Sequence, residues 1–538
     1  MLLSYEKSAT RALAQGRKGM VSSPHHLASL AGLAILQEGG NAVDAAIAVN
    51  ATLAVVYPHM TGLGGDSFWL IHDAGENRSH AFNGTGRAIS GATPEFYRSR
   101  GHSEIPARGI LGAITVPGAV DAWCKAHEKF GRLPLAACLS HAIDYAREGY
   151  PVSRGQERFT RQGAAMLAEN PSGARVYMPN GSPPKTGDIM RNTQLADTLA
   201  AIAREGRSGF YEGSVRDEMV RALNEGGPGC TPEDFSSHHG DWNEPISTTY
   251  RGYTCLQHPP NSQGFVHLMA LNILENFDLA SLGHDSAAYV HLLVEATKLS
   301  FIDRDRYLTD PDHVSIPMDT LLSKEYAASL AARISMDATL DIESMQMGQD
   351  TTCAVVVDGD GNAASIIQSI YHEFGSGFVA GETGVVLQNR GSFFSLDPEH
   401  VNSLKPGKRC FHTLMPGLML KDGRLAAAYG TMGGEGQPQT STALITRMVD
   451  FGLDAQDTVD APRWLYGRTW GAETKSLRVE QRFSDEDRAR LKTLGHEVET
   501  VEAFSDAVGH AAAICVDHET GVLSGGADPR SDGIAVGW

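Results

Sequence analysis

The strongest candidate for a catalytic residue in this sequence is a threonine that directly follows an aspartate at the start of a strand-like segment. Asp350, Thr351 and Thr352 begin the alternating segment TTCAVVVD. A threonine hydroxyl is a weak nucleophile, but it becomes competent when its own α-amino group, with a pKa of roughly 7.7–8.0, is free to accept the hydroxyl proton. That amine is freed if the Thr351 hydroxyl attacks the Asp350 carbonyl and water resolves the resulting ester. Taken alone, the same residues also describe an ordinary strand that begins after a turn.

Motifs for other familiar chemistries are absent from the sequence. It contains no HExxH, GxSxG, Walker or EF-hand pattern, and its seven cysteines form no CxxC pair. Adjacent histidines point apart on a helix or strand, so the pairs at 25–26 and 238–239 favour loop histidines over metal ligands. The glycine cluster at 61–66 lacks the GxGxxG spacing of a dinucleotide site and predicts a tight turn. We therefore expect neither a metal nor a cofactor.

The net charge and the hydropathy of the sequence indicate which classes of binding partner can be excluded. The 538 residues include 45 Lys and Arg against 64 Asp and Glu, a formal net charge of −19. This acidic excess disfavours nucleic acid and anionic membrane surfaces as partners. No apolar run approaches 18 residues, charged residues interrupt the N-terminal segment, and unpaired cysteines suit a reducing compartment. We expect a cytoplasmic protein that binds neither membrane nor nucleic acid.

The elements that must position Thr351 can be read from hydrophobic periodicity. Apolar spacing predicts helices over 27–38 and 41–55, followed by a turn and the strand SFWLIH. The region 117–345 predicts mostly helix, with surface loops at 169–191 and 225–245. Hairpins are predicted from 351 around the turn DGDGN and again over 414–430, with a helix over 440–452 and strands over 511–528. Helices first and hairpins later indicate an α+β layered fold rather than alternating βαβ units.

Longer motifs run through nearly the whole chain in a fixed order. They are GGNAVDAAIAVNATLAVVYPHMTGLGGD, ITVPGAVDAW, HPPNSQG, DRDRYLTDPD, DTTCAVVVDGDGNAASIIQS, FGSGFVAGETGVVLQN, MPGLML, GTMGGEG and DPRSDG. With these motifs the sequence resembles the γ-glutamyltransferase (γ-glutamyl transpeptidase) family of N-terminal-nucleophile hydrolases. The resemblance implies a four-layer αββα sandwich. It also implies a proenzyme that cuts itself into a large fragment, 1–350, and a small catalytic fragment, 351–538.

The resemblance also implies roles for individual residues. The two fragments would stay together as one intertwined heterodimer, which could pair further. Thr351, freed from Asp350, would be the nucleophile, and its α-amine the general base. Gly433 and Gly434 would form the oxyanion hole, and Ser369 stands where the family has a threonine that supports the nucleophile.

The positions that hold a glutamyl group in the family are changed in this sequence. Thr85 stands where the resemblance places the carboxylate-binding arginine, and Arg87 follows two residues later. Phe393 replaces the aspartate that binds the ammonium group. The resemblance also places His412 and Thr413 at a serine pair that contacts the carboxylate, and Tyr371 at an asparagine beside the nucleophile. These side chains can donate hydrogen bonds and Arg390 lies near Phe393, so we expect substrate contacts from Tyr371, Arg390, His412, Thr413 and Arg87. An acyl group without an α-ammonium fits this set best, because a buried ammonium beside a phenyl ring would lack its counter-charge.

These changes lead to an expected substrate and to alternatives. The HTLMP and NRGSFF segments are similar to the acylase-like branch of the family, and in particular to the oxamate amidohydrolases of purine breakdown. We therefore expect hydrolysis of oxamate to oxalate and ammonia. The alternatives are a γ-glutamyltransferase or glutathione hydrolase, another acylase such as one acting on a glutaryl group, and an unprocessed relative that serves as a scaffold. Structural roles are expected for Cys353, Arg530, Asp44 and Asp66: a buried thiol, an ion pair, a helix end and a turn.

Overall fold

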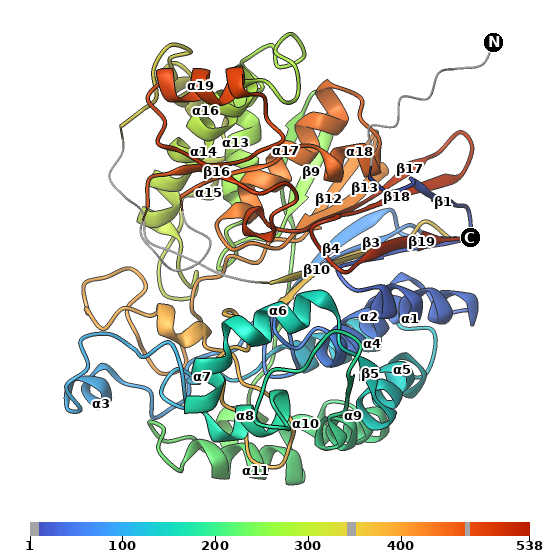
Figure 1. Ribbon diagram of the computed structural model, residues 1–538, viewed down its shortest axis with the longest axis vertical. Helices are drawn as coiled ribbons and strands as arrows, with labels where there is room; N and C mark the ends of the chain where they lie inside the picture. Colours follow the sequence, from blue (N-terminus) through green and yellow to red (C-terminus); the bar gives the residue numbers. More distant parts are fainter. Residues whose placement is uncertain (1–9, 342–350, 468–473) are drawn as a thin grey trace.

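Two seven-stranded antiparallel sheets lie face to face at the centre of the protein (Figure 1). The computed structural model describes residues 10–341, 351–467 and 474–538. The first sheet has the order β1 (Ala14–Gly16), β18 (Val522–Ala527), β17 (Ala511–Asp517), β13 (Arg424–Thr431), β12 (Gly417–Lys421), β9 (Tyr253–Gln257) and β8 (Ile246–Tyr250). The second has the order β19 (Ile534–Gly537), β2 (Gly19–Ser23), β10 (Thr352–Asp358), β11 (Ala363–Ser369), β3 (Asp66–Asp73), β4 (Arg78–Gly84) and β7 (Asp241–Asn243).

Helices cover the outer faces of both sheets and complete the four-layer αββα sandwich that the resemblance implied (Figure 1). The second sheet carries α1 (His26–Gln37), α2 (Ala42–Val56), α4 (Ala119–Phe130) and α5 (Leu135–Glu148), with α9 (Thr193–Glu205), α10 (Ser208–Tyr211) and α11 (Gly213–Leu223) beyond them. The first sheet carries α13 (Gly264–Leu274), α17 (Gly436–Asp450) and α18 (Ala455–Asp460), with α14 (Ala287–Tyr307), α15 (Met318–Leu321), α16 (Lys324–Ala331) and α19 (Asp485–Thr493) outside.

Smaller elements connect and flank these layers. The short helices are α3 (Pro94–Arg98), α6 (Arg154–Gln162), α7 (Ala164–Glu169), α8 (Pro171–Tyr177), α12 (Pro232–Ser236) and the 3-10 helices η1 (Arg390–Phe393) and η2 (Asp506–Val508). A three-stranded sheet holds β14 (Trp464–Tyr466), β15 (Leu477–Glu480) and β16 (Val498–Val501), and a two-stranded one holds β5 (Tyr150–Pro151) and β6 (Ile189–Met190).

The helices expected near the N-terminus form for the reasons that their sequence suggests. α2 begins with a capping box in which the Asn41 side chain accepts from the Asp44 amide and the Asp44 carboxylate accepts from the Asn41 amide. Every residue of α2 is buried, because the helix lies between the second sheet and neighbouring helices. The helix-end role expected for Asp44 is confirmed.

Alternation along β10 divides its side chains between two cores. Cys353, Val355 and Val357 face the first sheet, whereas Ala354 and Val356 face the helical layer that includes α2. The two sheets approach each other closely at Gly430 of β13. An added Cβ there would lie 2.5 Å from the Cys353 Sγ, so the glycine makes room for the thiol. The expected structural role of Cys353 matches this packing.

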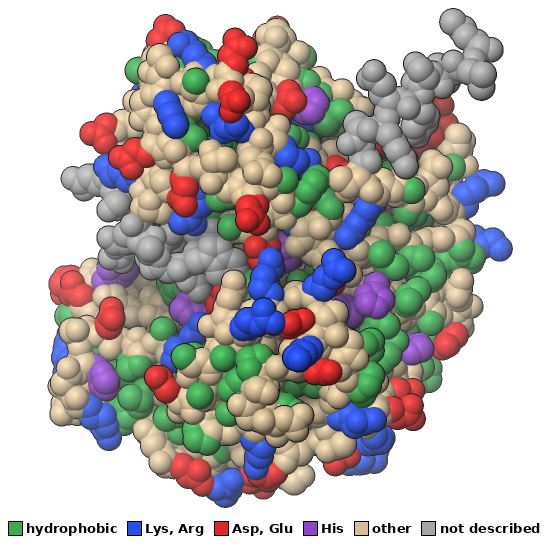
Figure 2. All heavy atoms as spheres, in the orientation of Figure 1, with side chains coloured by type: hydrophobic (Ala, Val, Ile, Leu, Met, Phe, Trp, Pro, Cys, Tyr) green, Lys and Arg blue, Asp and Glu red, His purple; other side chains and the backbone are tan. Residues whose placement is uncertain are grey.

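Some elements differ from the sequence expectation. The loop expected over 225–245 contains α12 and β7, and the mostly helical middle also contributes β8 and β9. These strands are short and lie at a sheet edge or, for β9, next to an edge strand, so hydrophobic periodicity gave little signal. No helix among the described residues is both long and apolar enough to cross a membrane. On the face shown in Figure 2, acidic and basic side chains are interspersed, with basic side chains gathered over α6.

Candidate functional site

Thr351 lies at the end of the second sheet, just before β10, and is fully buried. The β10–β11 pairing ends with Thr352 opposite Gln368, and Thr351 and Ser369 are the next residues on the two sides. Ser369 in turn pairs with Asp66 on β3. Directly opposed residues share one face of a sheet, and here that face is the one occupied by Cys353, toward the first sheet. Thr351, Ser369 and Asp66 therefore form one row between the two sheets, whereas Asp350 lies outside the described residues.

The glycine pair lies where the first sheet ends, between β13 and α17. Gly433 and Gly434 have φ angles of 118° and 51°, in the left-handed region that glycine adopts without strain. A side chain at 433 would also press on the Gly509 Cα, which lies 3.3 Å from the position of its Cβ. Among the described residues, the N–H groups of the pair donate to no acceptor. Two open amides next to the N-terminus of a 15-residue helix can stabilise a developing negative charge.

Buried polar side chains hold the glycine pair in place from behind. The Gln263 Nε2 group donates to the Gly434 carbonyl and to the Thr413 carbonyl, both at 2.9 Å. Arg304 is buried, donates to the Gln263 side chain at 3.3 Å and pairs with Glu435 at 3.1 Å. Gln263 therefore links the glycine loop to the segment that carries His412 and Thr413.

The Arg390 guanidinium is buried beside aromatic rings. Its Cζ lies 4.0 Å from the Tyr371 ring centroid and 5.4 Å from that of Phe393. The Nη2 group donates to the Thr413 Oγ1 at 3.3 Å, and Nε and Nη1 have no partner among the described residues. Burial lowers the pKa of Arg390 from its usual value, because desolvation disfavours the charged form. A buried cation with two unpaired nitrogens is suited to an anionic ligand.

Tyr371 has a φ angle of 81°, which is unusual for a residue other than glycine. Its ring packs edge-on against Phe393, with centroids 4.7 Å apart, and Phe393 packs in the same way against Phe411 at 5.1 Å. Strained backbone of this kind persists where surrounding contacts fix it, and it is common at functional sites. These aromatic rings give Arg390 an apolar wall.

His412 forms a buried pair with Asp66, and each side chain is at most 2% exposed. The His412 Nε2 lies 2.9 Å from the Asp66 Oδ2. The other carboxylate oxygen accepts from the amides of Gly86 at 2.9 Å and Gly118 at 3.1 Å. Burial, and then the charge of Arg390, lowers the pKa of His412 to about 4. The histidine is therefore neutral at neutral pH.

Thr85 and Arg87 belong to a neighbouring polar network. Thr85 is buried and its hydroxyl donates to Asn83 at 2.6 Å. Arg87 lies 3.7 Å from both Asp241 and Asp312, so its charge is already matched. Among the described residues, Arg87 has no hydrogen bond or ion pair with Arg390, Tyr371, His412 or Thr413. In contrast, Arg390 contacts both Tyr371 and Thr413, the residue next to His412.

Several residues at this site were missed or given another role by the sequence analysis. Asp66 was interpreted as a turn residue, yet it also binds His412. Gln263 lies in the motif HPPNSQG without having been singled out, and the Asn261 Nδ2 of the same motif donates to the Cys410 carbonyl at 2.7 Å. Only the motif itself could have drawn attention to them, because the partners are far apart in the sequence. Arg530 forms the expected structural ion pairs, with Glu480 at 2.7 Å and Asp528 at 2.9 Å.

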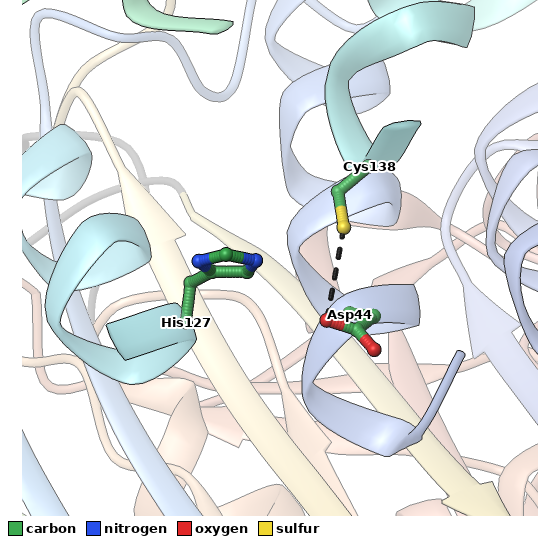
Figure 3. A group of neighbouring side chains, drawn as sticks. All are labelled: Asp44, His127 and Cys138. Atoms are coloured by element: carbon green, nitrogen blue, oxygen red, sulfur yellow. Dashed lines mark hydrogen bonds between the residues drawn. The ribbon is translucent and has the colours of Figure 1, made fainter. Parts of the chain in front are cut away.

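Two clusters of potential metal ligands are already occupied by other bonds. Figure 3 shows the Asp44 carboxylate with His127 and Cys138 beside it; that carboxylate accepts from the amides of Asn41, Arg132 and Leu133. In the second cluster, His291 and His496 bond each other at 2.8 Å. Its third member, Glu295, pairs with the ammonium group of Lys298 at 2.9 Å. We assign neither cluster to a metal.

Comparisons with known proteins extend these observations to the whole chain. A family model described as gamma-glutamyltranspeptidase matches residues 28–538. A glutathione hydrolase-like YwrD proenzyme of Bacillus subtilis (strain 168) is 53% identical over 97% of this chain and 99% of its own length. An oxamate amidohydrolase proenzyme of Klebsiella pneumoniae is 44% identical over 97% of this chain and 98% of its own. The crystal structure of a cephalosporin acylase from Bacillus halodurans matches with a TM-score of 0.91 and 38% identity, covering 100% of this chain and 98% of that one.

Proposed function

Because the chain belongs to the gamma-glutamyltranspeptidase family, we propose that it cleaves itself before Thr351 and then uses this threonine to hydrolyse an amide. Membership identifies the protein as a self-processing hydrolase that acts on C–N bonds. The related proenzymes support a cut that yields two associated fragments.

The proposed reaction has two halves that share one oxyanion site. The Thr351 Oγ attacks the substrate carbonyl while the free α-amine takes the hydroxyl proton, and the amide N–H groups of Gly433 and Gly434 bind the oxyanion. The amine then returns the proton to the departing nitrogen, which leaves an ester on Thr351. Water attacks that ester through the same oxyanion intermediate and releases the acid. Two observations support these roles: Thr351 and Ser369 lie at the same end of the β10–β11 pair, and Cys353, two residues after Thr351, packs against Gly430, three residues before Gly433.

The observation that carries the substrate proposal is the pair of unpaired nitrogens on the buried Arg390. A buried guanidinium without a carboxylate partner is costly, and a bound anion removes that cost. We therefore propose an amide whose acyl part carries a carboxylate. Arg390 binds this group, and the aromatic rings of Tyr371 and Phe393 exclude water around it.

A γ-glutamyl amide and oxamate both meet this description, as does the glutaryl amide named among the alternatives. The relative at 53% identity carries a glutathione hydrolase-like name, which supports the γ-glutamyl amide. The relative at 44% is an oxamate amidohydrolase, and Phe393 in place of an aspartate also favours oxamate. We place the γ-glutamyl amide first, which reverses the order expected from the sequence, because the greater identity supports it. Glutathione is then the natural test compound.

A substrate panel tests this proposal. Processed protein is assayed with glutathione, a γ-glutamyl anilide and oxamate, following the released amine or ammonia. Arg390→Met should raise KM for the accepted substrate at least 10-fold, whereas Arg87→Met, in the neighbouring network, should change it little. Equal losses in both variants, or an unchanged Arg390→Met enzyme, would contradict carboxylate binding by Arg390.

A further inference from the structure

The Asp66–His412 pair determines which of the two ring nitrogens of His412 carries the hydrogen. A carboxylate only accepts hydrogen bonds, so the His412 Nε2, 2.9 Å from the Asp66 Oδ2, must donate. The two backbone amides that donate to the other oxygen of Asp66 fix the orientation of its carboxylate. In a neutral imidazole the second nitrogen then has a lone pair. His412 therefore presents its Nδ1 as an acceptor.

This acceptor is unused within the protein. The His412 Nδ1 is buried and has no hydrogen-bond partner among the described residues. The Arg390 Nε and Nη1 are buried and unpaired in the same way, and Arg390 bonds Thr413, the residue next to His412. Other buried polar atoms among the described residues also lack a partner, but these three lie together, because Arg390 bonds Thr413, the neighbour of His412. We take them as groups that pair with a ligand.

The complementary ligand has two kinds of polar group. Arg390 offers donors and a positive charge, which suit a carboxylate. The His412 Nδ1 offers a lone pair with the negative charge of Asp66 behind it, which suits a positively charged N–H donor. A ligand that carries a carboxylate and an ammonium on one carbon satisfies both. A ligand with the carboxylate alone leaves the Nδ1 buried and unpaired.

We propose that His412, held in this tautomer by Asp66, accepts a hydrogen bond from the α-ammonium of a γ-glutamyl substrate, and so takes over the task for which Phe393 is unsuited. The proposal rests on the function proposed above and specifies its acyl group. The row from Thr351 through Ser369 to Asp66 spans two strand spacings, about 10 Å. Three carbons separate the reacting carbonyl from the ammonium in a γ-glutamyl group, so it can extend along this row. In oxamate the carbonyl and the carboxylate are directly bonded and there is no ammonium, so oxamate is too short to extend along this row.

Two anilides that differ only in the ammonium group test the proposal. γ-Glutamyl and glutaryl p-nitroanilides have the same chain length and the same carboxylate. We expect the unmodified enzyme to prefer the γ-glutamyl compound by roughly 10-fold or more in kcat/KM, the usual effect of one unpaired buried group. Competition with free glutamate and glutarate measures the same preference without any variant, and glutamate should bind more tightly.

Variants then assign this preference to the pair. Asp66→Asn lets the new amide donate to the histidine, so the Nδ1 becomes a donor; kcat/KM should fall roughly 10- to 100-fold for the γ-glutamyl anilide and little for the glutaryl one. His412→Phe keeps an aromatic ring but removes both ring nitrogens, so it should also remove the preference for the γ-glutamyl anilide. The matched control is His258→Phe, because His258 is equally buried and packs on the same Phe68 ring as His412. It should alter both substrates in equal proportion.

The outcomes separate this inference from the proposed function. Equal or better turnover of the glutaryl anilide by the unmodified enzyme would overturn the inference and leave a carboxylate-binding amidohydrolase. Parallel losses for both anilides in Asp66→Asn and His412→Phe would also overturn it, since the pair would then be structural. Ammonia release from oxamate with neither anilide cleaved would overturn the inference and the γ-glutamyl assignment together.

Discussion

At the scale of single residues, activity depends on one peptide bond, because the Thr351 amine is a base only once it is free. Thr351→Ala removes the attacking hydroxyl, so the chain should stay at 538 residues and show no amide hydrolysis. Thr351→Ser keeps a hydroxyl and should still cleave, though more slowly. A denaturing gel and sequencing of the new N-terminus measure both results. A terminus at Thr352 would contradict the assignment of the nucleophile.

The sequence motifs were sufficient to predict Thr351, Ser369 and the glycine pair as candidates, since each lies within a long motif. They were not sufficient for Asp66. Its partner, His412, is 346 positions away, and the local pattern TGLGGD describes a turn equally well. A hydrogen bond between such distant segments depends on the packing of two strands, which periodicity does not encode.

At the scale of elements, the close approach of β10 and β13 limits what their facing positions can hold. Gly430→Ala places a Cβ near the Cys353 Sγ and the Ile367 Cδ1, and should lower the free energy of unfolding by about 1–3 kcal/mol. Cys353→Ala should recover part of this loss, because it vacates the volume that the new methyl group needs. Denaturant titration of both single variants and the double variant measures the coupling. Additive losses would show that the sheets do not touch at this point.

Long and strongly patterned elements were predictable, and short ones were not. α1, α2 and the two hairpins carried by β10–β11 and β12–β13 lie close to their expected ranges. β7, β8 and β9 were missed because each has only three to five residues and depends on a neighbouring strand for its hydrogen bonds. The order of strands in each sheet also depends on contacts between distant segments.

At the scale of the whole molecule, buried neutral histidines make stability depend on pH. Burial lowers the pKa of His412 to about 4, and that of five others to about 3: His25, His258, His267, His496 and His510. In the unfolded chain each of these histidines binds a proton below about pH 6.5, whereas in the folded chain it stays neutral. The unfolded state therefore binds more protons, and a lower pH favours it. Stability is thus complete above about pH 6.5 and falls as pH drops toward 4, by about 1.4 kcal/mol per pH unit for each histidine.

Urea titrations between pH 7.5 and 5 measure this slope. His267→Gln should reduce it by about one proton, because His267 is fully buried and unfolding exposes it. His239→Gln is the control at a position where unfolding exposes little further surface, since the His239 side chain is already 63% exposed. A free energy of unfolding that is flat down to pH 5 would contradict the assignment of neutral buried histidines.

The strand order has a consequence for how the processed protein unfolds. A cut before Thr351 leaves five strand junctions between the fragments: β19–β2, β2–β10 and β11–β3 in one sheet, and β1–β18 and β12–β9 in the other. Neither fragment can then dissociate without breaking a sheet. Unfolding of the cut protein therefore separates two chains, and its refolding is bimolecular. The midpoint temperature of the cut protein should rise with protein concentration, while that of uncut Thr351→Ala should not. Self-cleavage would thus change the molecularity of folding while leaving the folded shape unaltered.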